Sequence, residues 1–186
     1  MMLIVLSIVW GGSFFFIGIS AKELPSFTIV FLRVGLASLL LWLGLMLVGL
    51  KMPKDKEVWK MFFSIGLVNN VMPFSLIVWG QHHITSSLAS ILNATTPFFT
   101  IVLAHFLTRE ERISKNRLLG LVIGFIGVSI IVGQDFVEGV GVGTWAQFAV
   151  LGAAFLYGVA LVYGRKFHSM GIKPIIAATG QLTAST

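Results

Sequence analysis

Cysteine is absent from the sequence, and charged residues are scarce. The lack of cysteine excludes disulfides, thiolate metal sites and cysteine nucleophiles. Charged residues make up 11% of the chain and hydrophobic residues 56%, whereas globular domains carry about 25% charged residues. A domain of 186 residues could not hide so much apolar surface in a core. We therefore expect a membrane protein, in which the net charge of +6 marks one membrane face and not a nucleic-acid partner.

Acidic side chains are missing from the long apolar segments. The seven acids all fall in predicted loops: Glu23, Asp55, Glu57, Glu110, Glu111, Asp135 and Glu138. A membrane-embedded carboxylate that carries protons is therefore not expected in this stretch. The sequence also has no Ser-His-Asp set, no paired carboxylates and no metal-ligand spacing of histidines. We expect neither an enzyme nor a cofactor or metal site.

Six long apolar segments are what the sequence does contain. Each approaches or exceeds the length of about 20 residues that crosses a bilayer as a helix. They run roughly over Met1–Ile19, Phe27–Leu50, Trp59–Gly80, Ile84–Leu107, Leu118–Val132 and Thr144–Tyr163. A seventh begins near Pro174, and the chain ends at Thr186 before that segment could cross. The predicted fold class is an all-α polytopic membrane protein.

Lysine and arginine cluster in alternate loops. The loops after the second, fourth and sixth spans hold 11 of the 13 basic residues. Loops of this kind stay in the cytoplasm. We therefore expect a multi-pass protein of a bacterial-type inner or plasma membrane with a cytoplasmic N-terminus. The links Ser20–Ser26, Gln81–His83 and Gly133–Gly143 are expected on the outside.

The first and sixth spans resemble each other weakly. Segments Ile8–Gly18 and Val150–Gly158 are both rich in small and aromatic residues, and basic residues follow each of them. Five crossings separate their starts, so the second copy must run in the opposite direction. That geometry is an inverted repeat, which is common in transporters. We expect a five-helix repeat over residues 1–134 and the start of an inverted second repeat over residues 144–186.

The pattern Asn-x-x-x-Pro occurs twice, as Asn69 with Pro73 and as Asn93 with Pro97. Proline cannot donate to the carbonyl four residues earlier, so each proline frees an asparagine carbonyl. Both asparagines lie about ten residues from the turn at Gln81–His83, which places them near the middle of the bilayer. Transporter sites lie at that level beside interrupted helices, and we predict that both pairs and the adjacent Asn70 line a pathway. The alternative is a pair of kinked helices whose asparagines bond to neighbours.

Small and polar residues recur along the fourth span at spacings of four and three. The stripe comprises Ser86, Ser90, Asn93, Pro97, Thr100 and Ala104. It places Ser90 and Asn93 on a single helix face, and we count Ser90 among the pathway candidates. A close helix–helix contact, which also favours small residues, is compatible with the same stripe.

The fifth span contains glycines at spacings of four and three: Gly120, Gly124 and Gly127. Such spacing allows close approach of a neighbouring helix. We predict that all three positions serve helix packing.

Arg33 is the cation inside a predicted span, about 9 Å from the outer end of the second span at 1.5 Å per residue. A charge at that depth must be paired or must snorkel to the interface. The alternative is a cation at the outer mouth of a pathway that attracts carboxylate-bearing solutes. Trp10, Phe14 and Tyr157 are candidate pathway aromatics, although tryptophan and tyrosine also anchor helices at membrane interfaces.

Several of these stretches resemble the EamA-type permeases of the drug/metabolite transporter superfamily. The resemblance includes Trp10–Phe14, which contains Ser13, and Phe31–Arg33. It is strongest over Gln81–Pro97, and it continues through Phe106–Glu110 to the glycines of the fifth span. The resemblance implies ten helices in two inverted five-helix repeats around a central cavity. It also implies export or exchange of amino acids, metabolites or drugs.

The leading hypothesis is a secondary transporter, an exporter of small metabolites or amino acids, represented by a truncated chain. Its expected partners are the lipid bilayer, a small-molecule solute, and either a second copy or a complementing second half, with no nucleic acid. On this hypothesis the chain by itself would not transport as a monomer, since alternating access needs two repeats. The alternative is a non-transporting membrane fragment or interaction subunit.

Overall fold

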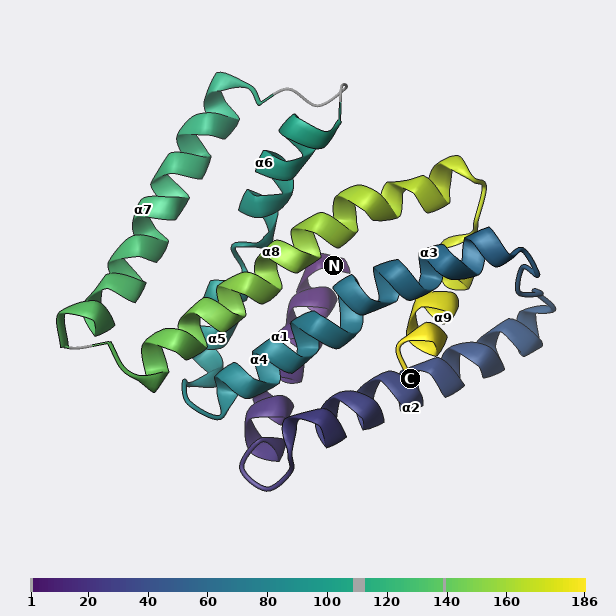
Figure 1. The fold of residues 1–186 in the computed structure, drawn as a ribbon, viewed down its shortest axis with the longest axis horizontal. Helices are drawn as coiled ribbons and strands as arrows, with labels where there is room; N and C mark the ends of the chain where they lie inside the picture. Colours follow the sequence, from purple (N-terminus) through teal and green to yellow (C-terminus); the bar gives the residue numbers. More distant parts are fainter. Residues whose placement is uncertain (1, 109–112, 139) are drawn as a thin grey trace.

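A computed structural model describes residues 2–108, 113–138 and 140–186, with the backbone alone for residues 134–138. The described residues form helices and no strands, so the predicted all-α fold is confirmed (Figure 1). Six of the helical segments are long and apolar enough to cross a membrane. Much of their outer surface is apolar and exposed, as on α1 (Met2–Ser20) and α2 (Ser26–Val48). Exposed apolar helices of this length are typical of contact with lipid.

The third span is one rod made of three pieces: α3 (Lys56–Gly66), the π-helical turn η1 (Leu67–Val71) and α4 (Met72–Gln81). Proline at position 73 has no N–H for the carbonyl of Asn69. The backbone widens just before it, and the N–H of Met72 bonds to the carbonyl of Leu67, five residues back. The interruption that Asn-x-x-x-Pro predicts is therefore present as a π-turn, a form common at functional sites.

The fourth span is broken in two. Helix α5 (Ser86–Asn93) ends at the asparagine of the second Asn-x-x-x-Pro pair, and α6 (Thr96–Leu107) begins one residue before Pro97. Between them, the buried hydroxyl of Thr95 donates a 2.6 Å hydrogen bond to the carbonyl of Leu92. The backbone N–H of Thr95 bonds to the same carbonyl at 3.1 Å, so a tight turn joins the two helices.

Helix α8 (Val142–Ser169) is the central element of the bundle and packs most extensively against α4 and α6. Helix α1 lies against α4 and α5, and α9 (Pro174–Ala184) lies against α2 and α3. Helix α7 (Lys115–Glu138) runs along the edge, beside α6 and α8 (Figure 1). The link from α2 to α3, the start of α7 and the link from α8 to α9 share one end of the bundle, which we call the basic end.

Two helices are longer than their apolar segments predicted. Helix α7 continues through the expected link to Glu138, and α8 starts at Val142 and runs six residues beyond Tyr163. The expected outer link Gly133–Gly143 is therefore largely helical where it is described. Backbone hydrogen bonding can continue a helix into water after the apolar residues stop, so hydropathy marks the membrane-crossing part and not the helix ends.

One of the three fifth-span glycines has a close neighbour in the part of the chain that the structure describes. A Cβ at Gly124 would overlap the ring of Phe98, so α7 approaches α6 closely there. A Cβ at Gly120 or Gly127 would meet nothing within 4 Å, and both positions are exposed. Gly120, Gly124 and Gly127 share one helix face at spacings of four and three, and the packing role of Gly120 and Gly127 remains a prediction.

Candidate functional site

A cavity of about 1690 Å³ enters the bundle from the basic end. Its wide part is bordered by Ser7 of α1, Arg117 of α7 and His168 of α8. Its inner part reaches Arg33 and Asn93, and is walled by α1, α2, α6, α8 and α9. The cavity therefore runs from one end of the helices to about their middle.

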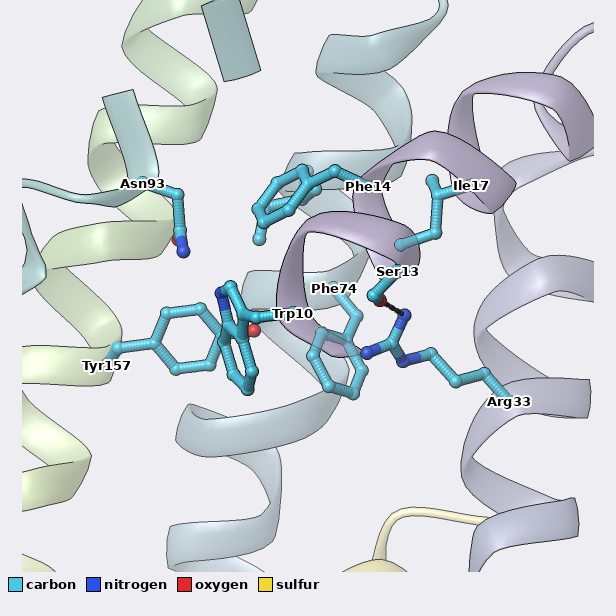
Figure 2. A pocket seen from close by; sticks show the side chains of 9 residues that line it. Trp10, Ser13, Phe14, Ile17, Arg33, Phe74, Asn93 and Tyr157 are labelled. Carbon is cyan, nitrogen blue, oxygen red and sulfur yellow. Dashed lines mark hydrogen bonds between the residues drawn. The ribbon is translucent and has the colours of Figure 1, made fainter. Parts of the chain in front are cut away.

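A small recess lies at the inner end of this cavity (Figure 2). Its volume is about 10 Å³, which is room for one water-sized group. Both spaces share Trp10, Arg33, Phe74, Asn93 and Tyr157, and the recess adds Ser13, Phe14, Ile17 and Ile77. The aromatic and aliphatic side chains among these additions are buried, so they close the cavity toward the end opposite the basic one.

Arg33 lies at this closure and does not extend to an interface. Its Nη1 donates a 2.6 Å hydrogen bond to the hydroxyl of Ser13. Its guanidinium carbon lies 4.5 Å from the centre of the Phe74 ring, in cation–π contact. The side chain therefore extends from α2 toward α1 and α4 (Figure 2). Its place in a solute pathway remains a prediction.

Asn93 reaches the recess from the broken fourth span. It is the last residue of α5 and only 5% exposed. Its side-chain oxygen has no hydrogen-bond partner among the described residues. Figure 2 shows the amide pointing into the space between Phe14, Trp10 and Tyr157. A buried acceptor without a partner is costly, and so this oxygen is suited to accept a bond from a solute or water.

Aromatic rings form the walls beside these polar groups. Tyr157 of α8 is buried and meets the ring of Phe74 edge-on, with centroids 6.2 Å apart. Trp10 of α1 is 49% exposed and borders both the recess and the wide cavity. The arrangement can hold an apolar solute body against rings while Arg33 and Asn93 offer opposite hydrogen-bonding roles.

The asparagines of the third span lie farther toward the basic end. The amide of Asn69 donates to Gln181 at 3.2 Å, and that of Asn70 donates to Ser185 at 3.2 Å. Asn69, Asn70 and Gln181 all border the wide cavity. Their bonds join the π-turn to α9. Each asparagine therefore both borders the cavity, as the pathway interpretation has it, and bonds to a neighbouring helix, as the kinked-helix interpretation has it.

The remaining sequence candidates divide in the same way. Pro97 borders the wide cavity, whereas Pro73 is buried in packing and Ser90 bonds to the carbonyl of Ser87. Neither Pro73 nor Ser90 lines either space. Pro73 acts on the site only by shaping the π-turn.

Sequence reasoning missed Phe74 and Gln181. Phe74 follows Asn70 by four residues and so shares its helix face. Gln181 belongs to a cavity-facing run on α9 with Pro174, Ala177 and Ala178. Helical spacing could have indicated both residues. It would have done so only with knowledge of which face of each helix borders the cavity.

The charge of the cavity is one-sided. Arg33 and Arg117 line it, and no acidic residue does so in the parts of the chain that the structure describes. A cleft that is lined by charges of one sign and has low-dielectric walls concentrates solutes of the opposite charge. The cavity is therefore suited to anions.

Comparison with known proteins identifies a transporter family. Residues 1–133 match the EamA-like transporter family. The chain is 24% identical over 163 residues to the uncharacterized transporter YoaV of Bacillus subtilis, covering 88% of this chain and 56% of that protein. It is 25% identical over 165 residues to the uncharacterized inner membrane transporter YedA of Escherichia coli, covering 88% and 52%. An uncharacterized transporter of Archaeoglobus fulgidus is 30% identical over 161 residues, covering 86% and 54%.

The chain spans about half the length of these curated relatives. No solved structure matches it. The resemblance drawn from the motifs is thus confirmed at the level of the family.

Proposed function

The chain belongs to the EamA-like transporter family, and from this premise we propose that it forms the pathway of a secondary transporter for small metabolites or amino acids. The observation that carries the proposal is the cavity itself. It runs from the basic end to a polar recess beside the broken fourth span and close to the π-turn of the third. Transporter sites commonly lie at such interruptions near the middle of the membrane.

The direction of access follows from the loop charges. Lysine- and arginine-rich loops stay in the cytoplasm, so the basic end faces the cytoplasm and the cavity is open inward. A solute from the cytoplasm would reach Arg33 and Asn93 and meet the closure formed by Phe14, Ile17 and Ile77. This state is the loading state of an exporter.

The transport cycle we propose uses inverted repeats. Residues 1–134 form the first five-helix repeat, and residues 144–186 begin the second. Helix α1 opens the first repeat and α8 opens the second, and both border the recess, through Trp10 and Tyr157. Movement of one repeat against the other around this level would exchange the open side.

An efflux assay tests the proposal. Bacterial cells that overproduce the protein are compared with cells that produce Asn93→Leu, and small metabolites in the medium are measured by mass spectrometry. We expect at least one metabolite to accumulate in the medium several-fold faster with the wild-type protein. Asn93→Leu should reach the membrane in equal amount, since leucine has a similar volume and removes a buried oxygen that has no described partner. Equal efflux from both strains and from cells without the protein would contradict the proposal.

A further inference from the structure

Arg33 is a cation inside the membrane that no described carboxylate neutralises. Its described partners are one hydroxyl and one aromatic face, those of Ser13 and Phe74. A guanidinium has five N–H donors, so most of its donor capacity is not used by these contacts. Charged groups at membrane depth are costly unless paired and mark solute pathways. An anionic group of a bound ligand would stabilise the charge at this position.

Asn93 supplies the complementary role on the other side of the recess. Its unpartnered oxygen is an acceptor, and the residue is 5% exposed. A bare carboxylate has only acceptors and cannot bond to this oxygen. A ligand that satisfies both residues must therefore carry an anionic group and a separate hydrogen-bond donor.

The charge of the cavity discriminates between two kinds of donor. A hydroxyl leaves the ligand a net anion, whereas an ammonium makes it a zwitterion and adds a second cation near Arg33. The described cavity lining offers arginines and no carboxylate to hold an ammonium. The aromatic faces of Trp10 and Tyr157 attract an ammonium only weakly compared with a carboxylate partner.

We propose that the inner end of the cavity, where it meets the recess, is a binding site for hydroxycarboxylates, in preference to amino acids. The carboxylate bonds to the guanidinium of Arg33, the hydroxyl donates to the side-chain oxygen of Asn93, and the hydrocarbon part lies against Trp10 and Tyr157. As the substrate class of the transporter, this assignment rests on the proposed function; as a binding site, it does not.

Four matched compounds test the site by isothermal titration of the purified protein in nanodiscs. They are 3-phenyllactate, 3-phenylpropionate without the hydroxyl, phenylalanine with an ammonium, and methyl 3-phenyllactate without the charge. We expect 3-phenyllactate to bind the wild-type protein about tenfold or more tightly than each of the others, because each lacks a complementary group or adds a repulsive one.

Two variants assign the contacts. Asn93→Leu should bind 3-phenyllactate and 3-phenylpropionate equally, since the acceptor of the hydroxyl is gone. Arg33→Gln should bind 3-phenyllactate and its methyl ester equally. Lys22→Gln removes an exposed cation of the α1–α2 link and should leave all four affinities unchanged. Loss of the ligand preference without loss of folding is an effect that a purely structural role would not produce.

The wild-type series decides the proposal even if Arg33→Gln fails to fold. Equal binding of acid and ester, tighter binding of phenylalanine, or no binding of 3-phenyllactate would overturn it. Efflux of a solute that lacks a carboxylate would leave the transporter proposal intact while this site fails. Tight binding of 3-phenyllactate without efflux of any solute would support the binding site and contradict the transporter proposal.

Discussion

The hydroxyl of Ser13 and the guanidinium of Arg33 join α1 to α2 across a distance of 2.6 Å at the level where the cavity closes. Helix α1 is otherwise little covered, since 11% of the residues in its most apolar stretch are buried inside the bundle. This bond therefore holds a weakly packed helix beside the recess. It also orients the cation toward the cavity.

Ser13→Ala should destabilise the protein. The substitution removes an acceptor from a part-buried charged donor, which costs about 1–3 kcal/mol. Thermal unfolding in detergent measures the change. Ser7→Ala is the matched control, because Ser7 is exposed and bonds to the carbonyl of Leu3 in its own helix. An equal melting temperature for wild type and Ser13→Ala would mean that this bond contributes nothing to the fold.

Gln81→Leu should loosen the closure opposite the basic end. The buried amide of Gln81 donates to the carbonyl of Phe14 at 3.0 Å and to the hydroxyl of Ser86 at 2.8 Å, so it ties α1 to α5. Leucine keeps the bulk and removes both bonds. A cysteine at Ile17, which is 8% exposed, should then react several-fold faster with a membrane-impermeant maleimide added from that side.

His82→Ala is the control for this experiment, because His82 lies in the same turn and its ring bonds to the hydroxyl of Ser26 at an exposed position. The cysteine at position 17 should react at the same rate in the His82→Ala protein as in the protein that carries only the Ile17→Cys substitution. If Gln81→Leu also leaves the rate unchanged, the closure does not depend on the amide.

Gly66→Ala should separate α3 from α9. A Cβ at Gly66 would lie 2.7 Å from the backbone oxygen of Gln181, and a backbone atom cannot move aside as a side chain can. Overpacking of this kind costs about 1–3 kcal/mol. Gly44→Ala should be neutral or slightly stabilising, since nothing lies within 4 Å of a Cβ there and alanine favours helix. Equal melting temperatures for the two variants would argue against this packing.

The basic end should face the cytoplasm. Lys54 lies in the α2–α3 link and Glu23 in the α1–α2 link, and both are exposed. Single cysteines at these positions should label from opposite sides of intact cells, with position 23 reacting from outside. The absence of native cysteine makes the background low. Labelling of position 54 by an impermeant reagent from outside would reverse the proposed orientation.

The spans could be predicted because each depends on local composition. Apolar segments of sufficient length identified all six crossings, and proline spacing located the interruptions at Asn69 and Asn93. The ends of α7 and α8 could not be predicted in this way, since hydropathy reports the membrane and not the helix. Helix contact at Gly120 and Gly127 remains a prediction, because small residues suit contact with a helix and with lipid alike.

The sequence by itself determined the class of protein and the six apolar segments that form the candidate spans of the described residues. Length, apolar composition and the missing proline donor act within one helix, so they can be read from neighbouring residues. Only the tertiary structure decided that Arg33 turns inward to Ser13 and Phe74, and that Asn93 faces the recess with an oxygen that no described residue bonds. Those relationships depend on how separate helices rotate and cross, and the angles are set by packing over the whole bundle.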